Sequence, residues 1–203
     1  LINGECPEHP GKKLEEVEEE NYFFKLSNYQ TQLLELIESN TLKIIPETRR
    51  NEALSFIKGG LEDFSISRSV ARARSWGVPV PGDDSQIMYV WFDALSNYIN
   101  ALGYGTNGKN FEKFWTEGNE RLHVIGKGIN RFHTIYWPAM LLSAGEALPT
   151  TVFIHGYINS GGQKMSKSVG NTIDPEEVIR EFGGEATRYF LARRVSSFED
   201  SDF

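Results

Sequence analysis

Residues 151–158 read TVFIHGYI, a short run rich in β-branched and aromatic residues that is typical of a buried strand. Two similar runs precede it, at residues 121–125 (RLHVI) and 87–92 (IMYVWF). Consecutive runs start 34 and 30 residues apart, which is the length of a strand–helix–strand crossover. We therefore predict three parallel strands with helical crossovers, that is, a doubly wound α/β sheet.

Helical patterns lie around and between these runs. Apolar residues recur at three- and four-residue spacing around Leu33 and Ile37, and Asp174 supplies an N-cap acceptor just before Pro175. The predicted helices cover residues 29–37, 49–59, 93–102, 126–144, 175–182 and 185–194. Ligands of such sheets bind beyond the carboxyl ends of the strands, which are here residues 91–93, 126–128 and 158–160.

The composition is that of an ordinary folded protein. Of the 203 residues, 39% are hydrophobic and 24% charged, which excludes a disordered chain, and no apolar run approaches the ~18 residues of a membrane span. The net charge of −7 excludes a chain dominated by phosphate-backbone binding. A single cysteine, Cys6, allows no internal disulfide, and the first residues do not read as a signal peptide. We therefore expect a cytoplasmic protein with no membrane contact.

The glycine-flanked loop at residues 161–171, GGQKMSKSVGN, is the most informative stretch for function. Lys164 and Lys167 lie three residues apart, with hydroxyl groups at Ser166 and Ser168. Mobile lysines and hydroxyls after a strand suit a pyrophosphate leaving group, on which negative charge grows as its bond breaks. A Lys-x-x-Lys pair alone is more often a solvated loop, so its place in the fold carries the argument.

The five residues Lys164-Met165-Ser166-Lys167-Ser168 resemble the KMSKS signature of class I aminoacyl-tRNA synthetases. Residues 63–68 (DFSISR), 76–81 (WGVPVP), 89–94 (YVWFDA) and 123–139 (HVIGKGINRFHTIYWPA) narrow the resemblance to the bacterial-type methionyl-tRNA synthetase family. The resemblance covers essentially the whole chain, and several amino-acid specificities share KMSKS alone.

The resemblance implies two sets of site residues. Lys164 and Lys167 are the expected catalytic residues. The expected ATP-binding residues are Lys164, Met165, Ser166, Lys167, Ser168, Lys127, Gly156 and Ile158. The expected methionine pocket is Trp91, Tyr98, Ile129, Phe132 and His133. An aromatic pocket with one weak polar contact suits a thioether, although each aromatic residue alone would equally suit a hydrophobic core.

The resemblance also implies an architecture and a reaction. We expect a helical remnant of a connective insertion at residues 1–60, the second half of a Rossmann-like nucleotide-binding domain at 61–160, and the KMSKS loop with the start of a helical module at 161–203. The implied reaction joins L-methionine to ATP, with Mg²⁺ accompanying the nucleotide, and transfers the methionyl group to tRNA(Met).

Several features depart from the family pattern. No His-Ile-Gly-His-type motif is present, so we expect the chain to lack the first half of the nucleotide fold and to be inactive alone. Position 128 is glycine where the family often has an acid. Cys6 and His9 resemble half of a zinc knuckle, and because structural zinc needs four ligands we expect none here. A non-catalytic fragment, or another nucleotidyltransferase with a lysine-rich loop, stays an alternative.

Overall fold

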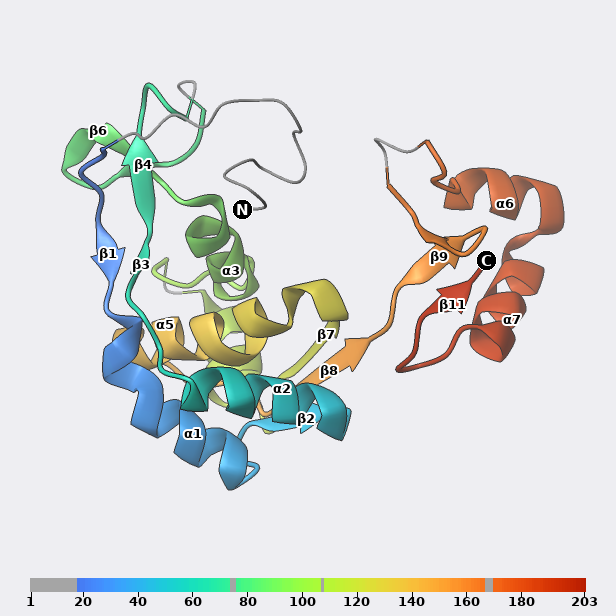
Figure 1. Cartoon of the computed structure of the whole chain (residues 1–203), viewed down its shortest axis with the longest axis horizontal. Coiled ribbons are helices and arrows are strands. Elements are labelled where there is room, and N and C mark those ends of the chain that lie inside the picture. Colours follow the sequence, from blue (N-terminus) through green and yellow to red (C-terminus); the bar gives the residue numbers. More distant parts are fainter. Residues whose placement is uncertain (1–17, 74–75, 107, 167–169) are drawn as a thin grey trace, which may run out of the picture. The chain divides into compact units, whose positions relative to one another are not determined.

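The computed structural model describes residues 18–73, 76–106, 108–166 and 170–203. They form two compact units (Figure 1). Among the described residues, the first unit combines residues 18–24 with the stretch from Phe64 to Asp93, and the second combines Lys25–Asp63 with the stretch from Ala94 to Phe203. Each unit therefore brings together two stretches that are separated along the chain.

The first unit is built from antiparallel strands. Its larger sheet has the order β4-β6-β5, in which Arg68 lies opposite Ile87, and β1 pairs with β3. The strands are β1 (Phe23–Phe24), β3 (Phe64–Ser65), β4 (Ser67–Ser69), β5 (Pro79–Val80) and β6 (Asp83–Met88). The Glu19 carboxylate accepts the backbone N–H of Ser69 at 3.1 Å and pairs with Arg72 at 3.0 Å, which ties the start of the described chain to β4.

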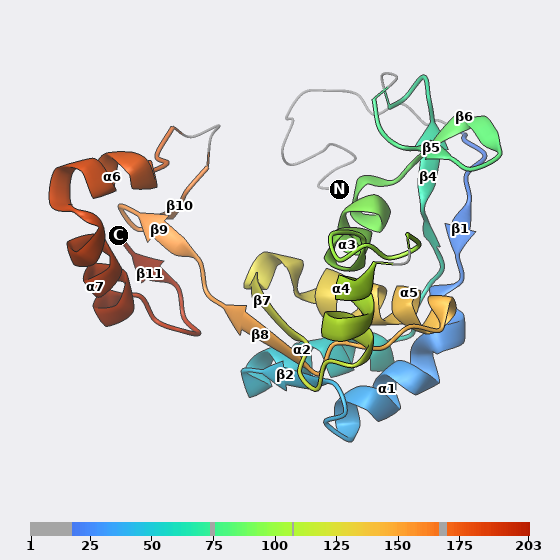
Figure 2. The ribbon, with the colours of Figure 1, turned by 180° about the vertical axis from the view of Figure 1, so that it is seen from behind.

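The second unit contains a parallel sheet with the order β2-β8-β7. Val152 in the central strand lies opposite Ile44 on one side and His123 on the other. The strands are β2 (Lys43–Ile45), β7 (Leu122–Gly126) and β8 (Thr151–His155). Figure 2 shows β7 and β8 running side by side. The crossover that joins them is helical and ends at Gly145, whose φ of 72° permits the left-handed helix stop.

Three helices of the second unit, α1, α2 and α5, bury apolar side chains. Leu33 and Ile37 of α1 and Ile57 of α2 are fully buried, as are Trp137 and Leu141 of α5. The helices are α1 (Gln30–Glu38), α2 (Glu47–Lys58), α3 (Val90–Asn100, shared with the first unit), α4 (Lys109–Phe111), α5 (Trp137–Ala144), α6 (Pro175–Phe182) and α7 (Gly184–Arg194). Shorter helical turns are η1 (Leu26–Tyr29), η2 (Glu112–Thr116), η3 (Lys127–Ile129) and η4 (Phe132–Tyr136).

A small mixed sheet follows the parallel one. Its order is β10-β9-β11, with β9 antiparallel to β10 and parallel to β11. The strands are β9 (Ile158–Ser160), β10 (Gln163–Lys164) and β11 (Ser201–Asp202). The signature loop therefore leaves a hairpin that extends directly from β8, the central strand of the parallel sheet.

The predicted helices are confirmed except in one crossover. The α1 face, the end of α2 before Gly59 and the start of α6 match their sequence patterns, and the Asp174 carboxylate accepts the N–H of Glu176 at 2.8 Å. The helix predicted over residues 126–144 is instead divided into η3, η4 and α5. Its apolar pattern cannot distinguish an α-helix from the wider turn of a π-helix, which is what η4 forms.

The predicted strand over residues 87–92 is wrong. β6 ends at Met88 and is antiparallel to its neighbours, and α3 starts at Val90, so Trp91 and Phe92 are helical. A short apolar run fits a strand or a buried helix equally well, because periodicity needs more residues to appear. The third parallel strand is instead β2, which lies within the stretch 1–60 that was predicted to be mostly helical. The predicted functional division at residues 60 and 160 stays a prediction.

Candidate functional site

The carboxyl ends of β7 and β8 form the edge at which the sheet predicts ligand binding. Gly126 and His155 are paired at this edge, so Lys127 and Gly156 follow at neighbouring positions. Because parallel strands end on the same side, both residues lie at the same edge of the sheet, where ligands of such sheets bind. We refer to Lys127, Lys164, Tyr157 and Asp200 together as the lysine edge.

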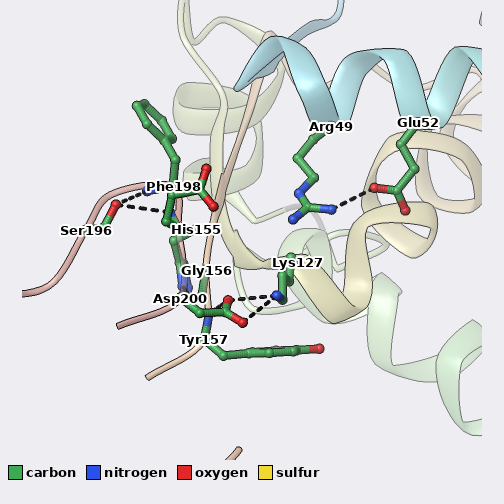
Figure 3. A network of polar contacts seen from close by, with 10 residues as sticks. Arg49, Glu52, Lys127, His155, Gly156, Tyr157, Ser196, Phe198 and Asp200 are labelled. Carbon is green, nitrogen blue, oxygen red and sulfur yellow. Dashed lines mark hydrogen bonds and ion pairs between the residues drawn. The ribbon is translucent and has the colours of Figure 1, made fainter. Parts of the chain in front are cut away.

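Lys127 is held by two partners in the lysine edge (Figure 3). Its ammonium nitrogen lies 2.7 Å from the Asp200 carboxylate and 4.8 Å from the centre of the Tyr157 ring. The Lys127 hydrogen bond, and then the backbone N–H of Tyr157, lower the pKa of the Asp200 carboxyl below its ordinary value. Asp200 is therefore an anion at neutral pH, and Lys127 is a cation in a defined position.

Lys164 reaches the same aromatic ring from β10. Its ammonium nitrogen lies 4.5 Å from the centre of the Tyr157 ring. Beyond it, Asn171 accepts the backbone N–H of Ser166 at 2.9 Å and donates to the carbonyl oxygen of Lys164 at 3.2 Å. Met165 and Ser166 are half-buried. The predicted residues Lys167 and Ser168 lie outside the described residues.

The predicted adenine-side residues occupy different environments. Gly156 is buried, and a Cβ atom there would lie 2.2 Å from the carbonyl oxygen of Glu199, so only glycine permits this close approach. Ile158 starts β9 and is 37% exposed.

Gly128 lies beside the Tyr157 hydroxyl, since a Cβ atom at position 128 would be 2.1 Å from that oxygen. The absence of a side chain at position 128 therefore leaves room for Tyr157.

Tyr98, Ile129, Phe132 and His133, four of the residues predicted to line the methionine pocket, are together called the pocket wall, and the structure joins three of them by hydrogen bonds. The Tyr98 hydroxyl lies 2.8 Å from Nε2 of His133, whose Nδ1 lies 3.0 Å from the carbonyl oxygen of Ile129. A carbonyl oxygen can only accept a hydrogen bond, so Nδ1 of His133 carries the proton. Nε2 of the neutral imidazole then accepts a hydrogen bond from the Tyr98 hydroxyl. Burial lowers the pKa of His133, which keeps the ring neutral, and burial raises the pKa of the Tyr98 hydroxyl.

The π-helical turn η4 sets the direction of these side chains. It covers Phe132–Tyr136, and the Phe132 ring packs edge-on against Tyr136 with ring centres 5.3 Å apart. The wider turn places His133 and Thr134 in the buried interior, and Thr134 donates to the carbonyl oxygen of Asn130 at 2.9 Å. π-Helical turns inside helices are frequent at functional sites.

Two residues behind the pocket wall were not predicted as site residues. Trp137 donates its indole N–H to Nε2 of His123 at 3.1 Å, and the Tyr98 ring lies 4.2 Å from His123 between ring centres. Burial, and then the neighbouring His133, lower the pKa of His123 to about 4. Both residues lie within residues 123–139, a stretch that resembles the family, and that is the sequence signal that could have drawn attention to them.

Trp91 lies in the first unit, in the first turn of α3. It precedes Tyr98 by seven residues on that helix, a spacing that returns to the same helical face. Its membership of a pocket with the other four residues stays a prediction.

Comparison with known proteins gives the family. A model described as "tRNA synthetases class I (M)" matches residues 1–203. The chain belongs to this family of class I tRNA synthetases. It is 51% identical over 193 residues to the methionine–tRNA ligase of Brucella suis biovar 1, covering 95% of this chain and 36% of that protein. It is 48% identical over 198 residues to the Thermotoga maritima methionine–tRNA ligase, covering 98% of this chain and 30% of that protein.

A solved synthetase also matches the fold. The Mycobacterium tuberculosis methionyl-tRNA synthetase in complex with methionyl-adenylate has a TM-score of 0.83 and 47% identity. That match covers 92% of this chain and 36% of the solved one. The apo form of the same enzyme matches with a TM-score of 0.78 and 42% identity. The chain thus spans about a third of the length of the synthetases that it resembles.

The described residues of this chain offer neither a candidate metal site nor a membrane-spanning helix. Within those ranges, no group of three or more His, Cys, Asp or Glu side chains is arranged to hold a metal ion. Cys6 and His9, the residues that resemble half of a zinc knuckle, lie outside the described residues. In the same ranges, no helix has the length and apolar character needed to cross a bilayer.

Proposed function

We propose that this chain supplies the lysine edge and the methionine pocket of an enzyme that activates methionine with ATP and transfers it to tRNA(Met). The observation that carries the proposal is the match to the M. tuberculosis synthetase, because that structure holds methionyl-adenylate. At 47% identity over 92% of this chain, the fold described above is similar to that of a protein in complex with methionyl-adenylate, which is the product of the proposed activation step.

The pocket wall supports binding of the methionine side chain. Ile129 and Phe132 supply apolar surface, and the Tyr98–His133 pair supplies a single polar contact in a dry environment. A thioether is apolar and polarizable, so its sulfur suits contact with aromatic rings, while the Tyr98 O–H and the His133 Nδ1–H stay bonded to Nε2 of His133 and to the Ile129 carbonyl. Trp91 is proposed as a further wall of the pocket. A charged side chain would lose its hydration beside this buried pair without gaining an ionic partner, which would favour methionine.

The lysine edge supports binding of the ATP phosphates. A methionine carboxylate oxygen attacks the α-phosphorus, a new carboxyl–phosphorus bond forms, and the bond to the pyrophosphate oxygen breaks. Pyrophosphate leaves with the electron pair of that bond. Lys127, Lys164 and Lys167 stabilise the negative charge that grows on the phosphate oxygens during this step, and no covalent enzyme intermediate is needed. Gly156 and Ile158 are proposed to place the adenine through their backbone groups.

Mg²⁺ is proposed to enter with ATP as part of the substrate complex. The described residues show no carboxylate cluster that would hold it, so we assign it no protein ligand and no step. In the second step, a terminal ribose hydroxyl of tRNA attacks the adenylate carbonyl, and AMP leaves. Residues 1–60, 61–160 and 161–203 are proposed as insertion remnant, nucleotide-binding half and start of the helical module. We propose a cytoplasmic location and no activity of the isolated 203 residues.

Methionine-dependent exchange of pyrophosphate into ATP, measured in the complete protein that contains this chain, tests the proposal. We expect exchange with methionine and at least tenfold less with leucine, since a pocket tuned for one side chain gains about 1–3 kcal/mol over a near neighbour. Exchange that does not depend on methionine would contradict the methionine pocket. No exchange with any amino acid would contradict the activation step itself.

A further inference from the structure

A segment distant in sequence completes the lysine edge. Asp200 lies 73 residues after Lys127 and 43 after Tyr157, and its carboxylate contacts both. It accepts from the Lys127 ammonium at 2.7 Å and from the backbone N–H of Tyr157 at 2.9 Å (Figure 3). Neither Asp200 nor Tyr157 was among the residues expected to bind a substrate. Their contacts nevertheless converge on two lysines that were.

The Tyr157 ring is shared by two cations. Lys127 approaches it from η3 at 4.8 Å, and Lys164 approaches it from β10 at 4.5 Å. An ammonium group near an aromatic face is attracted by the ring quadrupole, an effect worth about 0.5–1 kcal/mol at exposed sites. The two ammonium groups repel each other, and the Asp200 anion offsets that repulsion on the Lys127 side.

The segment that carries Asp200 is itself fixed to the sheet. The Ser196 hydroxyl accepts the backbone N–H groups of Phe198 at 3.2 Å and Glu199 at 3.0 Å, which forms a tight turn. Phe198 packs against Phe153 of β8 with ring centres 5.5 Å apart. The backbone N–H of Ser201 then donates to the carbonyl oxygen of Tyr157 at 2.9 Å. Asp200 therefore acts from a rigid support rather than from a free tail.

We infer that Asp200 and Tyr157 are positioning residues that hold Lys127 and Lys164 together as a preformed pair of phosphate-binding cations. A free lysine side chain loses about 2 kcal/mol of rotamer entropy when a ligand immobilises it. A lysine that is already held loses less at the moment of binding, which is the general benefit of preorganisation. An ammonium has three N–H groups, so Lys127 can keep a bond to Asp200 while it donates to a phosphate oxygen.

The inference rests on the proposed function, because it takes ATP phosphates as the ligand of the two lysines. The test compares Asp200→Asn with Glu199→Gln in the complete protein, using methionine-dependent pyrophosphate exchange. Both variants remove one negative charge from adjacent positions, and only Asp200 pairs with Lys127. For Asp200→Asn we expect kcat/KM for ATP to fall about tenfold, the loss of one charge-assisted contact, with KM for methionine within about twofold. Glu199→Gln should match the wild type.

A double-mutant cycle separates positioning from a general structural role. In a Lys127→Met background, Asp200→Asn should add less than about twofold to the loss, because its effect acts through Lys127. A full additive loss, an equal loss in Glu199→Gln, or a gain of activity in Asp200→Asn would overturn the inference. A wild-type protein without methionine-dependent exchange would instead overturn the proposed function, so the two failures are distinguishable.

The ring provides a second measurement that does not depend on the folding of the Asp200 variant. Tyr157→Phe keeps the aromatic face and should keep KM for ATP within about twofold, whereas Tyr157→Leu removes the face and should raise that KM about threefold. Equal KM values for the phenylalanine and leucine variants would overturn the role of the ring. Thermal unfolding of each variant shows whether a kinetic change occurs in a folded protein.

Discussion

The pocket wall and the lysine edge lie in the same unit and differ in burial and in charge. His133 in the pocket wall is 2% exposed, whereas the side chains of Lys127 and Asp200 in the lysine edge are 25% and 37% exposed. Neutral groups are fixed in the pocket wall by burial and by a chain of hydrogen bonds. Charged groups are fixed in the lysine edge by mutual attraction in partial contact with water.

This difference in burial and charge predicts how salt and pH should affect each region. Exposed charge pairs weaken as salt increases, since the Debye length shortens, while buried neutral hydrogen bonds do not. Buried imidazoles respond to pH instead, because the protonated ring would lose its hydration. Binding of methionine should therefore be sensitive to acid, and binding of ATP should be sensitive to salt.

Lys167, the second lysine of the signature loop, gives the largest expected effect on the proposed phosphate chemistry. Replacing it in Lys167→Ala removes a cation whose contact strengthens as charge grows on the leaving pyrophosphate. We expect the rate of methionine activation to fall about 10²–10³-fold, as when one preorganised transition-state contact is removed. Methionine affinity, measured by equilibrium binding, should stay within about twofold. Lys58→Ala, which removes a surface lysine paired with Glu38, is the matched control. A parallel loss of rate and methionine affinity would count against this role.

Acid tests the buried region. His123 has a folded-state pKa of about 4, below the ordinary 6.5, so the folded chain binds fewer protons than the unfolded one. The contribution of neutral His123 to the free energy of unfolding is therefore fully present above about pH 6.5. It is lost as the pH falls toward 4, by about 3 kcal/mol in total for a shift of this size. Chemical denaturation at a series of pH values measures this slope. His123→Gln should flatten it, and an unchanged slope in that variant would show that other groups cause the loss.

Tyr98 tests whether the pocket wall works through its hydrogen bond. Tyr98→Phe leaves the ring in place and leaves Nε2 of His133 without its donor, which costs about 1 kcal/mol. We expect KM for methionine to rise about five- to tenfold, while KM for ATP stays constant. Tyr189→Phe is a control, because Tyr189 on α7 is 70% exposed. An unaltered KM for methionine would remove the Tyr98 hydroxyl from recognition.

Gly128 gives the smallest expected effect and tests the geometry of the lysine edge. A Cβ atom in Gly128→Ala would displace the Tyr157 hydroxyl and move the ring away from the two lysines. KM for ATP should rise about threefold, which corresponds to the loss of an exposed cation–π contact. Gly184→Ala adds the same methyl group where no atom lies within 4 Å and should change nothing. A normal KM for ATP in Gly128→Ala would show that the ring position is unimportant.

Sequence patterns over a few adjacent residues predicted helix caps, buried helix faces and part of the parallel sheet. The cap at Asp174, the buried face around Leu33 and Ile37, and the strands β7 and β8 follow from short-range spacing. β8 is shorter than predicted, because it ends at His155 and residues 158–160 form β9 in another sheet. The run at residues 87–92 misled because six apolar residues carry too little periodicity to separate a strand from the start of a helix. β2 was missed because three residues, KII, give almost no signal.

The residues of the candidate site likewise fall into those that sequence motifs predicted and those that only the structure revealed. The signature residues Lys164–Ser168 and the aromatic residues of the methionine pocket came from recognisable motifs, and their roles stay predictions. Tyr157 and Asp200 were assigned no role, and neither were His123 and Trp137, although the last two lie in a stretch that resembles the family. Their importance appears only in contacts between segments that lie far apart along the chain.

The sequence by itself determined the family, the helix caps and faces, and the two central strands β7 and β8, because each is encoded within a few adjacent residues. Only the tertiary structure decided which strand completes the parallel sheet, how η4 turns His133 inward, and which acid meets Lys127. The physical reason is that burial and ion pairing depend on distance in space. Lys127 and Asp200 are 73 residues apart in the chain and 2.7 Å apart in the fold.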